Sequence, residues 1–310
     1  MFIPNNHFEY PKMTDETNFN STESSTASLG YRDLTAVHNC RDVGATMNRF
    51  FGKPVMKEGL FFRSGRLDFA TPADLELLTG STRLKSIIDL RTKTELERVP
   101  SKTPDGHPIA VVSGATVYLI PYINDEYTKK ALLSKLSWPR FIQIIIYHFL
   151  GFQNAIAVLI SRLVIVPLGL RGIARECVKW LGPEIKQTFD IFSDENKYPT
   201  LIHCTQGKDR TGLATLLILL AILGETDADV KAIDYDYMLS NEGLSKLRDE
   251  MKKEMAPFGF PDDFLFAEEG WVEATVELIE ERGGIEKYLA SVGVTGDDIK
   301  KLRENLLIKP

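Results

Sequence analysis

The residue types that can do chemistry are concentrated in HCTQGKDRTG, residues 203–212. This stretch follows the apolar run PTLIHC, which is typical of a strand, and leads into TGLATLLILLAILG, which is apolar on all sides like a buried helix. A tight turn from a strand into a helix directs backbone N–H groups and the positive end of the helix dipole at one point. The sequence therefore predicts an anion-binding loop, in which Gly207 permits close approach of the backbone to a ligand.

Cys204 and Arg210 are the residues of the predicted loop that can carry out a reaction. Cysteine thiols at helix N-termini are acidified, so Cys204 is expected to be a thiolate nucleophile at neutral pH. The planar fork of Arg210 can hold two phosphate oxygens and follow their charge in the transition state. We therefore expect Cys204 to attack a phosphate monoester and form a cysteinyl-phosphate that water hydrolyses, with no metal or cofactor. The alternative is a buried cysteine at a strand end, followed by a solvated Lys-Asp-Arg turn.

HCTQGKDRTG resembles the signature loop of the cysteine-dependent protein tyrosine phosphatase superfamily. Its GKDRTG ending is similar to that of the bacterial and fungal tyrosine phosphatase group, some members of which also act on phosphoinositides. Further matches to the same group occur upstream, in this order: NCRDVGA, LFFRSGRL and IIDLRTKTELE. Cys40 and Ala45 depart from the group's usual Phe and Gly, and Cys40 leaves open a disulfide with Cys204 under oxidation. The resemblance implies a phosphatase fold and phosphatase activity through Cys204.

The leaving oxygen of the substrate needs a proton, and the resemblance implicates Asp209 as the acid that supplies it. Other relatives in the superfamily place this acid after a Trp-Pro pair, but here Arg140 follows Trp-Pro. Dual-specificity relatives place an Asp upstream of the cysteine, but residues 163–189 contain no Asp. A carboxylate that braces Arg210 is the alternative role for Asp209. Asp89 ends a predicted strand and could reach the same edge of the sheet, where ligands gather in open α/β folds.

The other residues of the loop are expected to contact the substrate. They are Thr205, Gln206, Gly207, Lys208 and Thr211. Thr211 is also expected to hydrogen-bond the sulfur when it departs. Lys208 is a second cation, which suits a ligand with more than one phosphate, and a solvated surface lysine is the alternative.

Supporting roles are expected for His203, Asp89, Arg91 and Arg63. Strand alternation should point His203 away from the nucleophile, so we expect it to orient the loop by a hydrogen bond. Asp89 and Arg91 are expected to be structural. Arg63 and Arg66 would widen the basic rim of the site, with isolated solvated arginines as the alternative.

Short apolar runs with helical segments between them predict an α/β fold with a phosphatase-like, mostly parallel central sheet flanked by helices. Residues 1–30 are rich in Asn, Ser and Thr and predict a disordered tail. Residues 31–310 are expected to form the phosphatase domain. From Asp227 onward the pattern is amphipathic and predicts a helical C-terminal layer.

Residues 138–180 are expected to form an apolar helical insertion or lid. Phe141 to Ser161 carries no Asp, Glu, Lys or Arg, so buried helices, a hairpin resting on a membrane surface through residues 138–170, and a true membrane span are all considered. A single span would place the strands before and after it on opposite sides of the membrane. The predicted common sheet therefore argues against a span.

Composition narrows the class of partner. The net charge of −6 makes nucleic-acid binding unexpected and requires a local basic cluster for any anionic ligand. Three scattered cysteines and an N-terminus without signal-peptide features predict a cytoplasmic protein, with membrane association if the apolar insertion rests on a bilayer. The expected partner is a phosphorylated protein or phosphoinositide substrate. A catalytically silent phosphate-binding scaffold and a rhodanese-like sulfurtransferase are the alternative functions.

Overall fold

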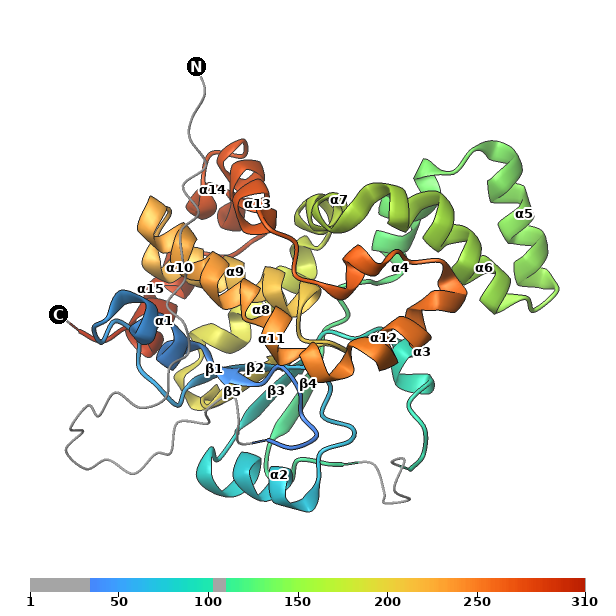
Figure 1. Cartoon of the computed structure of the whole chain (residues 1–310). Helices are drawn as coiled ribbons and strands as arrows, with labels where there is room; N and C mark the ends of the chain where they lie inside the picture. The colour runs from blue at the N-terminus through green and yellow to red at the C-terminus, as the bar shows by residue number, and fades with distance from the viewer. Residues whose placement is uncertain (1–33, 103–109, 310) are drawn as a thin grey trace.

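The computed structural model describes residues 34–102 and 110–309 (Figure 1). The tail expected at residues 1–30 lies outside the described residues. In the described part, a central sheet is surrounded by helices, and the long apolar insertion extends from one side of the molecule (Figure 1). The predicted α/β class is confirmed.

The sheet has five strands in the order β1-β2-β5-β3-β4. They are β1 (Arg41–Asp42), β2 (Phe61–Ser64), β3 (Ser86–Asp89), β4 (Thr116–Leu119) and β5 (Thr200–His203). Only the β1–β2 pair is antiparallel among the described strands, and β2, β5, β3 and β4 run parallel. Every residue of β2, β3 and β5 is buried, including the polar residues at the strand ends, because helices cover both faces of a parallel sheet.

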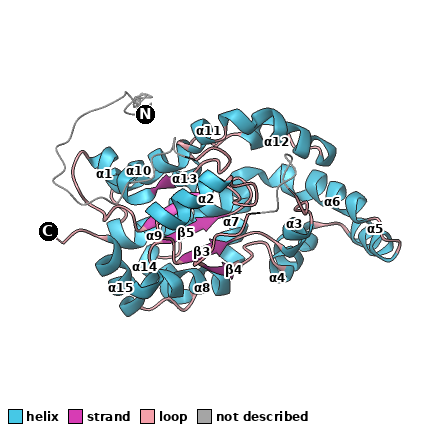
Figure 2. Cartoon of the chain, turned by 90° about the horizontal axis from the view of Figure 1, so that it is seen from below, coloured by secondary structure: helices cyan, strands magenta, loops and turns pink. Residues whose placement is uncertain are grey.

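Helices cover both faces of the sheet (Figure 2). They are α1 (Val43–Phe51), α2 (Pro72–Glu76), α3 (Lys93–Glu97), α4 (Asp125–Tyr127), α8 (Gly182–Ser193), α9 (Asp209–Leu223), α10 (Asp227–Met238), α11 (Ser240–Gly243), α12 (Arg248–Met255), α13 (Trp271–Glu280), α14 (Ile285–Ser291) and α15 (Gly296–Leu306). Successive strand residues alternate between two cores. Phe61 and Ile202 join the larger core with α9, while Phe62 and Leu201 join the smaller core.

Helix α9 is the central helix of the larger core. It is buried from Thr211 to Ile222, as its uniformly apolar sequence predicts, and it ends at Gly224. Helices α10, α14 and α15, from the C-terminal third of the chain, pack against it. The expected helical C-terminal layer therefore holds in place the helix that follows the candidate catalytic loop.

The apolar insertion forms a helical arm. It consists of α5 (Trp138–Phe149), α6 (Gln153–Ile160), a wider helical turn at Ser161–Ile165, and α7 (Val166–Trp180). Figure 1 shows α5 as the outermost helix of the arm. Trp138 and Phe149 of α5 are 71% and 83% exposed, so α5 is not a buried helix, and the lid and membrane-surface alternatives stay predictions for this part of the insertion. α5 and α6 pack against each other and leave the outer face of α5 without a partner in the described structure.

One described helical stretch, Gln153–Trp180, is long and apolar enough to cross a membrane. It is not one regular helix, because Gly169 interrupts it with non-helical backbone angles. The strand β3 before the insertion pairs directly with the strand β5 after it. A single crossing would separate these two strands, so the sheet is incompatible with that arrangement.

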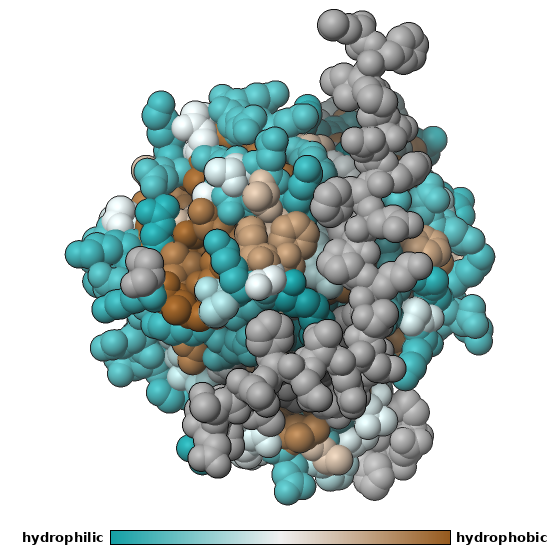
Figure 3. All heavy atoms as spheres, turned by 60° about the vertical axis from the view of Figure 1, so that its left-hand side comes forward, coloured by the Kyte–Doolittle hydropathy of each residue, from teal (hydrophilic) through white to brown (hydrophobic). Residues whose placement is uncertain are grey.

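Figure 3 shows another face of the molecule, on which most of the coloured side chains are hydrophilic and one area is hydrophobic. Of the 13 large hydrophobic side chains that are exposed in the described chain, eight lie in the arm, between Trp138 and Leu163.

Candidate active site

The predicted anion-binding loop lies between β5 and α9, at the carboxyl edge of the parallel strands. Cys204 follows the last residue of β5 and is 3% exposed. The backbone N–H of Gly207 donates to the Cys204 Sγ across 3.3 Å. The loop therefore directs a backbone donor at the sulfur, as expected for a site where an anionic thiolate or a phosphate is stabilised.

Gly207 cannot be replaced without displacing the backbone around it. Its φ is +68°, in the left-handed region that favours glycine. A Cβ at this position would lie 2.2 Å from the carbonyl oxygen of Ser64 at the end of β2. The close approach of the loop to β2 thus explains the glycine.

The outward carbonyls of the loop are held by buried side chains. Asn39 Nδ2 donates to the carbonyls of Gln206 and Gly207, at 3.1 and 2.9 Å. Arg63 Nη2 donates to the carbonyl of Gly207 at 2.7 Å. Because the carbonyls are satisfied on the outside, the peptide N–H groups are free to face the nucleophile.

Arg41 and Asp236 hold these two donors in place. Arg41 donates to the Asn39 side chain at 2.5 Å and to Asp236 at 2.7 Å, and Arg63 also forms an ion pair with Asp236. Burial would raise the pKa of Asp236, but the two guanidinium groups lower it below its usual range. We call Asn39, Arg41, Arg63 and Asp236 the carbonyl clamp. Burial lowers the pKa of Arg63 to about 10, so the guanidinium remains charged at neutral pH.

This clamp revises the expectation for Arg63. The side chain is 0% exposed and contributes nothing to a basic rim. Its supporting role is instead internal, because it faces the back of the catalytic loop. Arg66 does lie at the surface side of the loop: its guanidinium stacks over Phe69 and lies 3.5 Å from Glu254 of α12.

Glu95 orients the catalytic arginine, and sequence reasoning missed it. Arg210 Nη1 and Nη2 each donate to the Glu95 carboxylate at 2.7 Å, and the Thr205 hydroxyl donates to it at 2.6 Å. An arginine has five N–H donors, so this end-on pairing leaves the Nε edge of the guanidinium for a phosphate. Burial favours the neutral acid, but Arg210 and these hydrogen bonds keep the pKa of Glu95 well below its usual range.

A signal for Glu95 was present in the sequence. It lies within the IIDLRTKTELE match, four residues after Arg91 and three residues after Thr92. Thr92 and Glu95 form a capping box that starts α3. A capping glutamate directly after a buried strand is therefore positioned at the same sheet edge as the catalytic loop.

Asp209 is the first residue of α9, and its Oδ1 is buried without a hydrogen-bond partner among the described residues. Its nearest cation is Lys208, with 3.7 Å between Nζ and Oδ1. The alternative role of bracing Arg210 belongs to Glu95 instead. Asp209 thus places a carboxyl group at the start of α9, directly after the loop.

The expectation that Lys208 contacts a second phosphate does not fit its position. Lys208 is 0% exposed, and its Nζ donates to the carbonyls of Phe264 and Phe266, each at 2.7 Å. It is not a solvated surface lysine either. Burial lowers its pKa, while Asp209 acts in the opposite direction. The ammonium ties the catalytic loop to the segment after α12, because two fixed carbonyls replace the water that it loses on burial.

His203, Asp89 and Arg91 have structural contacts, in agreement with their expected supporting roles. His203 Nδ1 lies 3.2 Å from the carbonyl oxygen of Cys204, and Nε2 lies 3.7 Å from Asp89. Burial lowers the pKa of His203, although Asp89 opposes this effect, so the imidazole is neutral at physiological pH. Arg91 pairs with Asp89 and with Asp68. These bonds leave Asp89 unsuited to act as the acid.

The two remaining loop side chains, Thr211 and Gln206, have different surroundings. The Thr211 hydroxyl is buried and has no hydrogen-bond partner among the described residues. Gln206 faces Met255 of α12, with 3.9 Å between its Nε2 and the sulfur.

No disulfide joins the three cysteines. Within residues 34–102 and 110–309, no group of three His, Cys, Asp or Glu is placed to hold a metal ion.

The site combines a thiol in the loop between a strand and a buried helix, a backbone donor directed at its sulfur, and an oriented arginine fork. These features define the class of cysteine-based phosphate-binding sites. The chain belongs to the tyrosine phosphatase family, whose sequence profile matches residues 32–308. This membership makes it an enzyme of the protein tyrosine phosphatase class and confirms the resemblance found in the sequence.

Two curated relatives are informative. The chain is 34% identical over 144 residues to a tyrosine-protein phosphatase of Nostoc commune, covering 42% of this chain and 47% of that protein. It therefore spans about half the length of that relative. It is 30% identical over 313 residues to the triple specificity protein phosphatase PtpB of Mycobacterium tuberculosis, covering 90% of this chain and 100% of the relative.

Replacing Glu95 by Gln should impair the enzyme through Arg210. The change removes the charge and one acceptor of the paired carboxylate, so we expect kcat/KM on an aryl phosphate to fall roughly 10- to 100-fold. Steady-state kinetics measure this effect. Glu97→Gln, an exposed change in the same helix, is the matched control and should match the wild type. A Glu95→Gln enzyme within twofold of wild type would remove Glu95 from the site.

Replacing Asn39 by Ala should loosen the catalytic loop. Two buried carbonyls lose a donor, which we expect to raise the inhibition constants of phosphate and vanadate roughly tenfold. Thermal unfolding measured in parallel separates this local effect from global destabilisation. Asn196→Ala, at an exposed turn, serves as control. Unchanged oxyanion binding by a folded Asn39→Ala protein would show that the clamp does not shape the loop.

Proposed function

We propose that this protein hydrolyses phosphate monoesters, first of all phosphotyrosine in proteins, through a cysteinyl-phosphate intermediate on Cys204. The observation that carries the proposal is the Gly207 N–H directed at the sulfur, beside an arginine whose free edge faces outward from its Glu95 partner. Together these groups can stabilise the charge on a phosphate while it is transferred.

Both steps of the proposed reaction use groups already in place. The Cys204 thiolate attacks phosphorus as the bond to the alcohol oxygen breaks, and the Asp209 carboxylic acid gives that oxygen its proton. Asp209, now a carboxylate, then takes a proton from the water that attacks the cysteinyl-phosphate. The S–P bond breaks, phosphate leaves, and the unpartnered Thr211 hydroxyl is available to stabilise the departing thiolate.

Phosphoinositides are the second candidate substrate. Lys208 no longer supports this choice, because its ammonium is bound to two carbonyls. The support comes from the arm at residues 138–170, whose exposed apolar side chains fit peripheral contact with a membrane. The name of the relative PtpB, a triple specificity protein phosphatase, is consistent with a site that accepts several classes of substrate.

Three buried cysteines without a disulfide support action in a reducing compartment such as the cytoplasm.

A parallel phosphate-release panel tests the function. Wild-type protein is assayed on phosphotyrosine, phosphoserine and phosphothreonine peptides and on vesicles containing phosphoinositide monophosphates, with Cys204→Ser as control. We expect release from the phosphotyrosine peptide and none by Cys204→Ser, which should still bind vanadate. Turnover by Cys204→Ser would refute the mechanism. A wild type that binds vanadate but releases no phosphate would indicate a silent scaffold.

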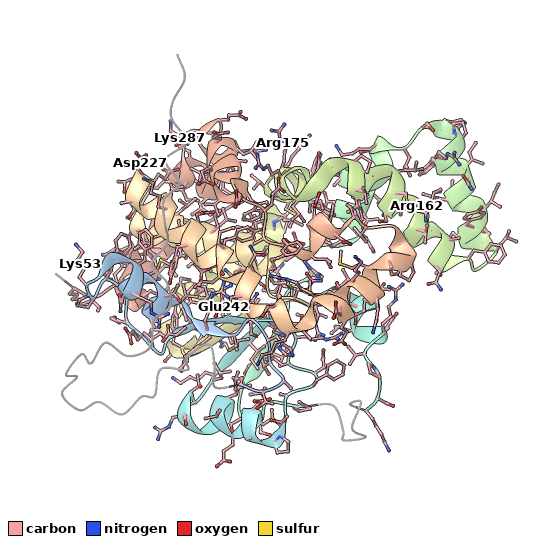
Figure 4. The ribbon with its side chains drawn as sticks, viewed as in Figure 1. Lys53, Arg162, Arg175, Asp227, Glu242 and Lys287 are labelled. Carbon is pink, nitrogen blue, oxygen red and sulfur yellow. The ribbon has the colours of Figure 1, made fainter. Side chains whose placement is uncertain are left out.

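Replacing Asp209 by Asn tests the proton donor. We expect kcat to fall roughly 100-fold on a phosphotyrosine peptide and less on an aryl phosphate with a more acidic phenol, because the better leaving group needs less protonation. Asp227→Asn is the matched control, since Asp227 is also the first residue of a helix, α10, but is exposed (Figure 4). Equal losses on both substrates would assign Asp209 a structural role.

A further inference from the structure

The outer face of α5 carries a continuous apolar surface. Five of its large side chains are 39–83% exposed. They are Trp138, Ile142, Ile145, Ile146 and Phe149, which we call the α5 stripe. Their spacing of three, four and seven residues places them on one side of the helix. Contiguous apolar surface of this kind on a soluble domain marks a contact site.

The same arm is basic, although the whole chain is acidic. From Tyr127 to Arg175 the sequence contains no Asp or Glu but seven Lys or Arg residues, in a chain of net charge −6. The cations are Lys129, Lys130, Lys135, Arg140, Arg162, Arg171 and Arg175, and all are exposed. Figure 4 shows Arg162 on the arm, Arg175 near the middle of the view, and Lys53 on the side opposite the arm.

Part of this charge is available to a partner. Lys130, Lys135 and Arg171 form ion pairs with acids outside the acid-free segment. The other four cations have no ion-pair partner within the described chain. Arg140, in the first turn of α5, bonds only the neutral Gln143. The α5 stripe therefore has a cation on its own helix, Arg140, that is unpaired in the described structure, and an anionic surface can neutralise that charge.

The charge decides between the candidate occupants of the stripe. A second copy of the chain would bring an equally basic arm against the first, and like charges in contact cost free energy. The helix has 12 residues, which corresponds to a length of about 18 Å and is too short to cross a bilayer. A helix with an apolar face, nearby cations and aromatic residues at both ends suits the plane of a lipid interface.

We propose that the α5 stripe docks on an anionic lipid surface and thereby holds the catalytic domain at a membrane. The inference deepens the proposed function, since it rests on that function for its biological purpose: it would bring the Cys204 site to phosphorylated headgroups or membrane-bound phosphoproteins. Docking itself needs no turnover. The apolar side chains supply partitioning free energy, and the cations add attraction that salt screens.

Vesicle co-sedimentation tests the proposal with the full chain. The probes are phosphatidylcholine vesicles with and without phosphatidylserine. Wild type should bind the phosphatidylserine vesicles, and the triple variant Ile142→Ser, Ile145→Ser, Phe149→Ser should bind at least about tenfold more weakly. All three side chains are exposed, so the fold should be retained. Val111→Ser removes an apolar side chain that is 75% exposed elsewhere and should change nothing.

Two matched single variants test how much positive charge contributes to vesicle binding. Arg140→Gln should weaken binding to phosphatidylserine vesicles by several fold, and Lys53→Gln, an exposed cation on the far side of the body, should not. Raising the salt concentration should weaken wild-type binding and reduce the difference between wild type and Arg140→Gln.

Several results would overturn the proposal. An anionic lipid partner is contradicted if the wild type does not bind phosphatidylserine vesicles, or if it binds pure phosphatidylcholine vesicles equally well. A wild-type dimer that the triple variant dissociates, without vesicle binding, would assign the stripe to a second copy. Activity on a soluble aryl phosphate, measured in the same samples, should be equal in wild type and triple variant. Loss of that activity in both would refute the proposed function and leave the docking result intact.

Discussion

The structure of the site depends on the outward carbonyls of the loop that follows Cys204. Backbone N–H groups can converge on an anion only if the carbonyls of the same peptides point away from it, and buried carbonyls need donors. Asn39 and Arg63 provide these donors, and Asp236 anchors Arg63 from α10. Strands β1 and β2 and helix α10 must therefore pack together behind the loop. This requirement gives a physical reason for motifs far apart in the sequence to accompany the catalytic loop.

The site also concentrates positive charge in a poorly solvated place, and each of its buried cations has a fixed partner, although Arg41 and Arg63 share Asp236. Asp236 neutralises Arg63, Glu95 holds Arg210, and backbone carbonyls bind Lys208. Desolvating a charge without such partners would cost several kcal/mol. The pairing with Glu95 has a second effect, since it fixes the guanidinium plane while leaving one edge open. The catalytic loop is thus ready for a phosphate before the substrate arrives.

Charge is distributed unevenly between the two parts of the molecule. The rest of the chain is acidic overall, whereas the segment from Tyr127 to Arg175, which includes most of the arm, has only basic charged residues. The arm adds little to the core, as the exposed face of α5 shows. Its insertion between β4 and β5 leaves the sheet order undisturbed, because β3 and β5 pair directly across it. The arm can therefore carry a separate binding function on a catalytic scaffold that does not depend on it.

The sequence by itself predicted the candidate nucleophile. It also determined the loop, the parallel sheet and the buried helix after the loop, because these follow from local patterns: an apolar strand, a glycine-centred turn and an apolar helix. It also predicted supporting roles for His203 and Asp89. It could not show that Glu95 pairs with Arg210, because the two residues lie far apart in the sequence. It could not place Lys208 either, because the partner of its ammonium group is a distant backbone carbonyl, which sequence patterns do not reveal. It could not decide whether the apolar insertion is core or surface. Hydrophobicity shows only that a side chain is more stable out of water. Only the tertiary structure decides whether another part of the same chain covers it.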